Sequence, residues 1–452
     1  MTSPGVWVVG LLVCGGASVL AQQATVAPPR TITLSEAVDL ALKRNHDVRL
    51  ANLRVDEARH ARAIARSGYF PVVSSAGSKM HVSNTQLIEV PAGAFGVSDG
   101  KPIPPGPIVI NQGGETFGAI IGGLTQPITQ LLKTRAANDM ARAEADVARG
   151  LARETENDVA LAVHELYYKV LIAEAERGAA DARIRALSEL QSERAALVRQ
   201  GEALDSARIE SQAQSLQARQ ELLNVEILLA DLGMRFNEMI GLPLRTAVTL
   251  DPSVGEAQAD CPRDECVELA LQDVPTMAAA RAAVAKAEAA VRLAQYQFVP
   301  DVEAFVRYSY QEHFPFLARN FATVGVEFRY ELFDFGRRSA TIRERRSQLA
   351  AAREQLARAQ DDVELRVRTA QNKLERTREM IAVSAELLAL REESRRVIAE
   401  QATRGAALRS QVQSAVAQEF QARAMLLQSR LDYVQAADEM SRAVGRLPGG
   451  RR

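Results

Sequence analysis

The sequence is poor in aromatic residues and cysteines, and it carries no excess of charge of either sign. Aromatic residues make up 5% of the 452 residues, and 3 residues are cysteine. Lys and Arg number 55 against 56 Asp and Glu, so the charge balance predicts no nucleic-acid partner. The scarcity of aromatics makes their clustering informative, because twelve of the twenty-two fall between Tyr296 and Phe335.

Glycine and proline are absent from residues 337–404, a stretch of 68 residues. At about 1.5 Å per residue, one helix over this stretch would be roughly 100 Å long. Its apolar residues recur every seven positions, with one shift of four, which predicts coiled-coil packing with a stutter. This seam consists of Ile342, Leu349, Leu356, Val363, Ala370, Leu374, Ile381 and Leu388. Charges in every turn exclude a membrane-spanning helix here.

The first 21 residues are typical of a secretory signal peptide. Residues 6–13 form an apolar core, and small residues then lead to a cleavage site before Gln22. No Lys or Arg precedes the apolar core, so an N-terminal anchor or a misassigned start remains an alternative.

Export would place Cys261 and Cys266 in an oxidising compartment, where a local disulfide is favoured over two free thiols. Two cysteines without nearby histidines supply half of a zinc ligand set, so we expect no metal site. The five histidines lack the spacing of metal ligands, and the sequence offers no nucleophile paired with a base. We therefore expect no cofactor and no enzymatic activity.

An internal repeat organises most of the chain. A shift of 229 places Ala41-Leu42 on Ala270-Leu271, and a shift of 204 places Gly201 on Gly405. The difference of 25 residues indicates an insertion in the first copy, between about Lys79 and Thr125.

Each copy reads as helix, strand, loop, strand and a long helical hairpin. The first repeat spans 31–250, with strands at 72–83 and 116–126, a loop at 84–114 and a hairpin at 129–240. A linker at 251–264 follows, and the second repeat spans 265–447, with strands at 301–310 and 321–332 and a hairpin at 337–444. The 84–114 loop holds five prolines and many glycines, so we expect irregular structure and a surface position there.

The four strands alternate between apolar and polar residues over the length of a membrane-crossing strand. A hairpin of a soluble protein, with one face packed on the core and the other exposed to solvent, would show the same alternation. Aromatic residues at the junctions of strand and helix favour the membrane, because a girdle of aromatics lines the interface there. These junction residues are Tyr69, Phe70, Tyr296, Phe298, Phe333 and Phe335.

Four strands leave two open edges, and lipid offers no hydrogen-bond partner to them. Barrels of bacterial outer membranes use at least about eight strands, so two, three or four copies could close one together. The expected fold class is therefore mixed and mainly α: a long coiled-coil helical barrel plus four strands per chain that contribute to a shared transmembrane β-barrel.

The chain resembles TolC-type outer membrane efflux channels from about Thr31 to Leu447. The resemblance is carried by TLSEAVDLALKRNHDVR, YFPVV, FVPDV and ELFDFGRR, in duplicated order with the hairpin glycines Gly201 and Gly405. It implies a homotrimer in the outer membrane, in which twelve strands form one barrel and twelve helices continue it as a periplasmic tunnel. It also implies a periplasmic adaptor and an inner-membrane pump as partners, and passive conduction in efflux or type I secretion.

By the same resemblance, Gly201 and Gly405 form the periplasmic tip and contact the adaptor. Asp205 and Arg409 occupy equivalent positions after these glycines with opposite charges, which suggests a gate ion pair between neighbouring hairpins. A periplasmic coiled-coil scaffold or adaptor without a pore is the alternative, although it leaves the strand pairs with their aromatic borders unexplained.

Overall fold

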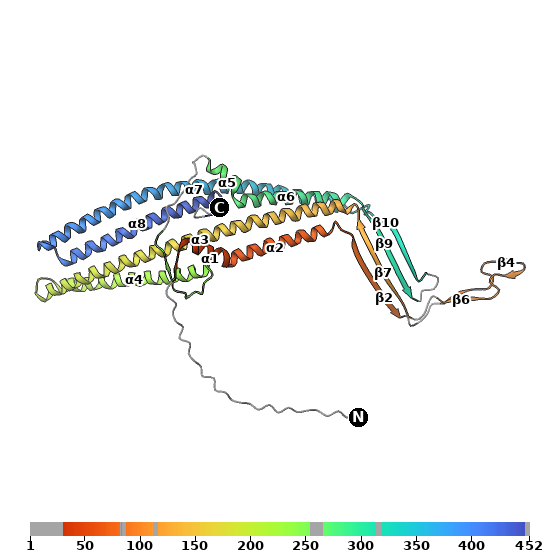
Figure 1. Ribbon diagram of the computed structural model, residues 1–452, viewed down its shortest axis with the longest axis horizontal. Helices are drawn as coiled ribbons and strands as arrows, with labels where there is room; N and C mark the ends of the chain where they lie inside the picture. The colour runs from red at the N-terminus through yellow and green to blue at the C-terminus, as the bar shows by residue number, and fades with distance from the viewer. Residues whose placement is uncertain are drawn as a thin grey trace, which may run out of the picture.

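The computed structural model describes residues 30–81, 83, 87–111, 116–253, 265–312 and 318–447. The signal peptide, most of the 251–264 linker and Cys261 lie outside these residues. The molecule is elongated, with long helices over most of its length, a four-stranded sheet at one end and a thin hairpin beyond the sheet (Figure 1).

The helices follow the duplicated order. The first repeat contributes α1 (Leu34–Arg44), α2 (His46–Ser67), α3 (Gln130–Arg199) and α4 (Asp205–Met239). The second contributes α5 (Cys266–Asp273), α6 (Pro275–Gln295), the short 3-10 helix η1 (Tyr296–Phe298), α7 (Arg337–Thr403) and α8 (Arg409–Ala443).

The opening helix of each repeat is broken, although the sequence predicts a continuous one. Asn45 ends α1 and also caps α2, because its side chain accepts a hydrogen bond from the Asp47 N–H at 2.8 Å. In the second repeat Val274 takes the same extended conformation, and Pro275 starts α6 at a position where its missing N–H costs nothing.

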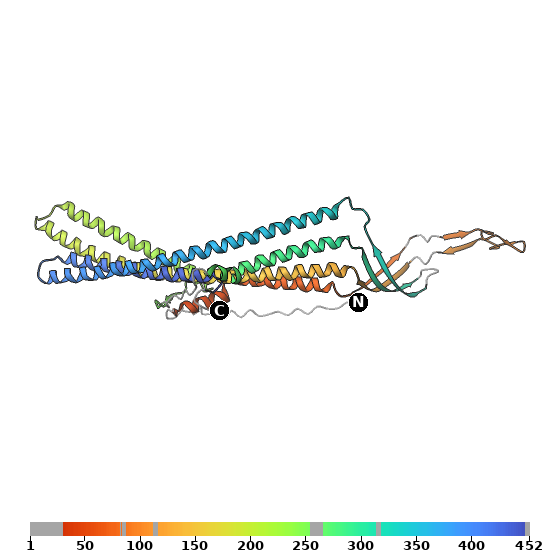
Figure 2. The ribbon, with the colours of Figure 1, turned by 90° about the horizontal axis from the view of Figure 1, so that it is seen from above.

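The helices form one curved layer in which α3 and α7 run the full length. Near the sheet the order of contacts is α2, α3, α6, α7, and toward the far end it is α4, α3, α8, α7. The layer is twisted, because α7 lies on opposite sides of α3 at its two ends (Figure 2). The residues of the seam identified in α7 are buried or half-buried, as coiled-coil packing requires.

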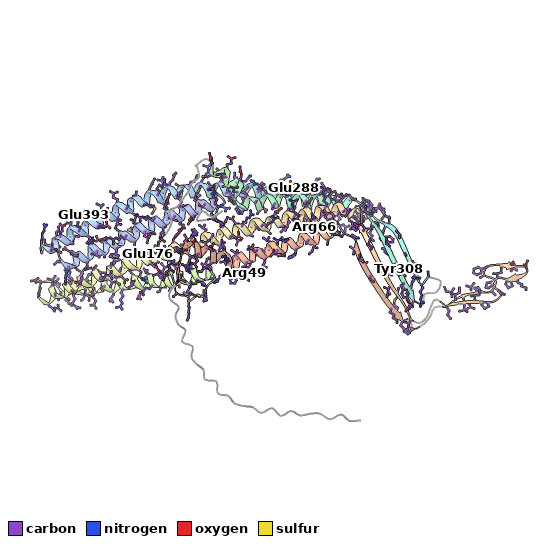
Figure 3. The ribbon with its side chains drawn as sticks, viewed as in Figure 1. Arg49, Arg66, Glu176, Glu288, Tyr308 and Glu393 are labelled. Atoms are coloured by element: carbon purple, nitrogen blue, oxygen red, sulfur yellow. The ribbon has the colours of Figure 1, made fainter. Side chains whose placement is uncertain are left out.

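Charged side chains such as Glu176, Glu288 and Glu393 project all along the helical part (Figure 3). Within the described residues, no helix combines the length and the apolar character needed to cross a bilayer.

The four-stranded sheet is antiparallel throughout, in the order β10, β9, β7, β2. Its strands are β2 (Val72–His81), β7 (Thr116–Pro127), β9 (Asp301–Glu312) and β10 (Asn320–Arg329). The pair at the centre, β7 and β9, joins the two repeats, and β2 and β10 form the edges. The fold class expected from the sequence is confirmed in its long helices, few strands and internal repeat.

A small parallel sheet, β1 (Arg30–Ile32) with β8 (Val248–Leu250), lies beside the middle of the helices. Tyr167 of α3 is buried there, and its hydroxyl donates to the carbonyls of Ile32 and Asp251. Burial raises the pKa of Tyr167 to about 12, so the hydroxyl keeps its proton and both bonds.

The expectation of irregular structure at 84–114 is wrong for two short strand pairs within residues 87–111 and holds for the turns between them. Two short antiparallel pairs form there, β3 (Leu87–Val90) with β6 (Ile108–Asn111) and β4 (Val97–Ser98) with β5 (Lys101–Pro102). The apolar segments LIEV and IVIN pair with each other, while most of the prolines lie outside the paired positions.

We expect Gly150→Ala to destabilise the fold, because α3 and α6 approach closely at this glycine. A Cβ atom at residue 150 would lie 2.8 Å from Cβ of Ala279 and 3.0 Å from the Pro275 carbonyl oxygen. The two helices must move apart, at a cost of about 1–3 kcal/mol in the free energy of unfolding. Denaturant unfolding followed by circular dichroism measures it.

Gly178→Ala is the matched control on the same helix. A Cβ there meets no atom within 4 Å. The helix propensity of alanine should make this variant neutral or more stable by up to about 1 kcal/mol. Equal effects of the two changes would contradict the close approach.

Candidate functional site

The two faces of the four-stranded sheet differ in chemistry. One face presents exposed apolar side chains, among them Val324 (76% exposed), Val326 and Phe328 on β10 and Val306 and Tyr308 on β9. Tyr308 is labelled on the sheet in Figure 3. The other face carries Asp301, Glu303, Arg307, Glu327 and Arg329 toward its helical end. Such a sheet suits lipid on one side and water on the other.

The six aromatic residues predicted at the junctions all lie where the strands meet the helices. Tyr69 and Phe70 precede β2, Tyr296 and Phe298 form η1 before β9, and Phe333 and Phe335 follow β10. The last two stack edge to face, with 4.6 Å between ring centroids. Phe335 is 90% exposed, so at least this ring is free to contact an apolar surface outside the chain.

The turn Asp334-Phe335-Gly336 is held by its aspartate. Asp334 accepts hydrogen bonds from the backbone N–H of Arg338 at 3.0 Å and of Gly336 at 3.1 Å, and these bonds hold the pKa of its carboxyl below the ordinary value. Phe335 has a φ of 52°, which is strained for a residue with a side chain. The turn therefore holds Phe335 in a strained backbone conformation in which its side chain is exposed.

Arg338 organises this junction; it ends the ELFDFGRR motif, but nothing in the sequence indicates its structural role. Its buried guanidinium donates to the Glu331 carbonyl at 2.6 Å and lies over the rings of Tyr330 and Phe298. The residue thus ties the start of α7 to the ends of two strands.

The opposite end of the molecule consists of two matching helical turns. Gly201 and Gly405 have φ values of 77° and 75°, which glycine adopts without strain. In both turns the N–H of the next residue bonds a carbonyl five residues back, from Glu202 to Leu197 and from Ala406 to Gln401. Both hairpins therefore close through the same helix-ending motif.

Asp205 does not pair with Arg409 within the chain. Its carboxylate accepts a 2.6 Å hydrogen bond from Arg208, one turn along α4, and this bond lowers the pKa of Asp205. A contact between Asp205 and Arg409 of neighbouring chains stays a prediction.

A different residue connects the two hairpins near this tip. Glu193 of α3 accepts a 2.8 Å hydrogen bond from the backbone N–H of Ser410, in the first turn of α8. A carboxylate at this position satisfies an unpaired N–H and complements the helix dipole. Sequence spacing could not reveal it, since the partners are 217 residues apart.

The model of the Outer membrane efflux protein family matches residues 37–231 and 266–446, one segment in each repeat. The chain belongs to this family. The match supports the resemblance to TolC-type channels and an outer membrane efflux channel as the general function.

Solved structures share this fold at low sequence identity. The CmeC outer membrane channel of Campylobacter jejuni gives a TM-score of 0.77 at 13% identity, covering 93% of this chain and 87% of that one. The outer membrane protein VceC of Vibrio cholerae gives 0.70 at 16%, covering 91% and 96%. A membrane protein of Pseudomonas aeruginosa gives 0.74 at 16%, covering 92% and 91%. No curated protein sequence matches the chain.

This efflux-family chain buries a polar cluster between its repeats at the middle of the helices. His164 of α3 lies 2.6 Å from the carboxylate of Asp438 on α8, and Tyr168 donates to the same oxygen at 2.9 Å. His164 is 3% exposed, so a solute does not reach it. The cluster joins the helices and offers no catalytic site.

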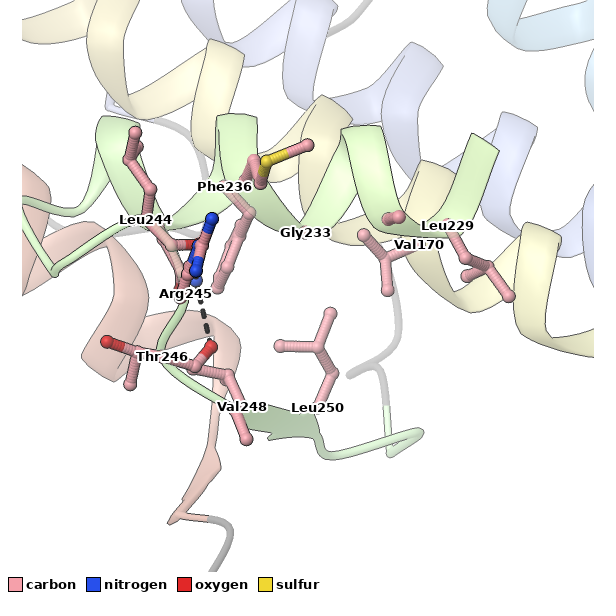
Figure 4. A pocket seen from close by; sticks show the side chains of 13 residues that line it. Val170, Leu229, Gly233, Phe236, Leu244, Arg245, Thr246, Val248 and Leu250 are labelled. Atoms are coloured by element: carbon pink, nitrogen blue, oxygen red, sulfur yellow. Dashed lines mark hydrogen bonds between the residues drawn. The ribbon is translucent and has the colours of Figure 1, made fainter. Parts of the chain in front are cut away.

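An open cavity of about 250 Å³ lies beside β8 and the end of α4. Its lining is mostly apolar, and Arg245 is the one ionisable residue among the thirteen (Figure 4). Asn237 uses its amide N–H groups to bond the carbonyls of Leu244 and Thr246, which fixes the chain that leaves α4. These features suit a structural role.

Cys266 is fully buried and disulfide-bonded. Cys261 lies outside the described residues, so its pairing with Cys266 stays a prediction. The described residues contain no group of three or more His, Cys, Asp or Glu that could hold a metal ion.

We expect Glu193→Ala to loosen the first turn of α8. Loss of the carboxylate leaves the Ser410 N–H without its partner, at a cost of about 1 kcal/mol. Hydrogen exchange of the Ser410 amide should accelerate by roughly fivefold, measured by mass spectrometry of tip peptides.

Glu202→Ala, at the exposed turn of the same hairpin as Glu193, is the control for removing an acid at the tip. It should leave exchange at Ser410 unchanged. If Glu193→Ala also leaves it unchanged, the contact does not stabilise the helix end.

Proposed function

We propose that three copies of this chain form an outer membrane channel of a tripartite efflux or type I secretion system. The channel conducts solutes passively from a periplasmic adaptor and inner-membrane pump to the cell exterior. Both the sheet and the helical layer have unpaired edges at their two sides, β2 and β10 in the sheet and α4 and α7 in the layer, and this observation carries the proposal.

The sheet edges call for a partner strand. β2 and β10 each bond a neighbour on one side alone within the described residues. An apolar face as exposed as that of Val324 and Phe328 suits lipid, where unpaired backbone groups cost several kcal/mol each. Pairing β10 of one copy with β2 of the next satisfies both edges, and three copies supply the twelve strands of a TolC-type barrel.

The helical edges carry apolar stripes that stay exposed among the residues that the structure describes. On α4, exposed residues recur mostly at spacings of seven: Ile209, Leu216, Leu223, Ile227 and Met234. On α7 a second stripe, separate from the buried seam, consists of Met380, Val383, Leu390 and Val397. Both have the spacing of coiled-coil seams.

The two stripes lie at matching levels. Glu221 of α4 bonds Arg183 of α3 at 2.8 Å, which sets the level of Leu223. On α3, Arg183 lies between His164, which contacts Asp438 of α8, and Glu193, which contacts Ser410 of α8. Arg183 is therefore level with the part of α8 between Ser410 and Asp438. In that stretch Gln418 accepts a 2.8 Å bond from Arg391 of α7.

Leu223 on one edge is therefore level with Leu390 on the other. If three copies form a ring without shifting along the long axis of the helices, α4 of one copy lies against α7 of the next. The apolar stripe of α4 then packs against the apolar stripe of α7. The same closure aligns β2 with β10, so one rotation satisfies both regions.

We expect cysteines at Leu223 and Leu390 in one chain to cross-link neighbouring copies. Packed helices lie about 8–10 Å apart, so a short bifunctional thiol reagent should give covalent trimers on a denaturing gel. Leu223→Cys with Leu365→Cys is the matched control, because Leu365 is also exposed on α7 but lies at a different level. Equal yields from the two pairs would contradict the register.

Conduction is tested on purified protein in planar bilayers, together with fractionation of cells. The channel should stay in the outer membrane after a high-salt wash, migrate as a trimer in detergent and carry current without an energy source. A periplasmic scaffold would be released by the wash and carry no current, which would refute the channel.

A further inference from the structure

Arg307 lies near the middle of β9, on the polar face of the sheet. Its guanidinium sits over the ring of Phe305, 4.2 Å from the ring centroid, and 3.6 Å from a carboxylate oxygen of Glu327 on β10. An arginine held by an aromatic ring and a carboxylate is fixed in position, yet half of its side chain stays exposed.

Glycines on the two flanking strands leave room for this arrangement. Phe305 packs across Gly325 of β10, where its ring comes within 2.9 Å of the place of a Cβ atom. On the other side the stem of Arg307 crosses Gly123 of β7, at 3.2 Å from the equivalent place. Aromatic cover of a strand glycine is a recurrent device that fixes both residues.

Glu327 does not neutralise Arg307, because it serves two arginines. Arg329 donates to Glu327 at 2.6 Å, a closer contact than that of Arg307. Glu303 lies directly opposite Glu327 in the strand register, so the charges of these two acids and the two arginines sum to zero, but both acids lie nearer the helices than Arg307. Arg307 holds its acid more loosely than Arg329 does and is the charge displaced toward the outer half of the sheet.

Arg307 is also the outermost charge on this face within the four strands. The polar-face residues of β2, β7, β9 and β10 farther from the helices are uncharged, for example Ser309, Ile121 and Phe321. Beyond the strands, Arg319 precedes β10 at the outer rim and adds charge of the same sign.

The nearest uncompensated acid is Glu303, whose partner Gln130 is uncharged. Asp301, farther inward, is paired with Lys133. Glu303 and Arg307 are four residues apart on β9, which is about 13 Å along a strand. This distance exceeds the screening length of about 10 Å at 0.1 M salt, so the two levels act separately on passing ions.

We propose that Arg307 is a selectivity-determining residue that favours anionic solutes at the outer half of the barrel. The inference rests on the proposed trimer, which turns the polar face toward the lumen and places three copies of Arg307 in one ring. Rings of Arg or Lys select anions in pores, and rings of Asp or Glu select cations. Phe305 and Glu327 act as positioning residues that hold the guanidinium at the wall.

The test is the reversal potential of reconstituted trimers in a potassium chloride gradient. Arg307→Gln should lower the chloride-to-potassium permeability ratio by about twofold or more, while Arg307→Lys keeps the wild-type ratio. Glu303→Gln should change the ratio in the opposite direction. Lys79→Gln, on the apolar face of the same sheet, is the matched control and should change nothing.

An unchanged ratio in Arg307→Gln, or an equal fall in Arg307→Lys, overturns the inference while leaving the channel intact. Absence of current from the wild-type protein refutes the proposed function instead. Trimers of normal mobility in detergent show that each variant has folded. If Arg307→Gln does not assemble, Arg307→Met removes the charge while keeping an unbranched stem across Gly123, and an unchanged ratio in that variant also overturns the inference.

Discussion

The structure depends on one constraint, which is that every backbone N–H and C=O group inside a bilayer needs a partner within the protein. Four strands from one chain meet this need in the middle of the sheet, between β7 and β9, and fail to meet it at β2 and β10. In the proposed trimer, association of identical chains pairs these open edges without any further element.

The helical part obeys a parallel requirement, with side chains in place of backbone groups. The seam of α7 that includes Val363 and Ala370 packs against other helices of the same chain, whereas the stripe that includes Leu390 stays exposed. A helix with two apolar stripes can pack against a neighbour on each side, as the proposed ring requires. The duplicated sequence fits that proposal, since each repeat supplies the same pair of strands and the same hairpin.

Polar contacts between the repeats stabilise the register of the helical layer. Glu193 meets the start of α8 near the tip, and His164 meets Asp438 at the middle. Both contacts join α3 to α8, so the two hairpins are aligned at two levels by directional bonds. Apolar seams alone would let one helix slide past its neighbour by seven residues, because the same pattern recurs. Such a shift would break the hydrogen bonds of Glu193 and His164, which makes it unfavourable.

Local rules in the sequence determined the long helices, the strand pairs, the hairpin glycines and the position of the junction aromatics, because each follows from periodicity or from a single residue's conformational preference. Tertiary structure alone decided the contacts of Glu193, His164, Arg307 and Arg338, whose partners come from other elements or depend on strand register. It also decided that residues 87–90 pair with residues 108–111, since a proline-rich composition does not reveal which of its apolar segments face each other. Periodicity specifies an element and its faces, and packing specifies which faces meet.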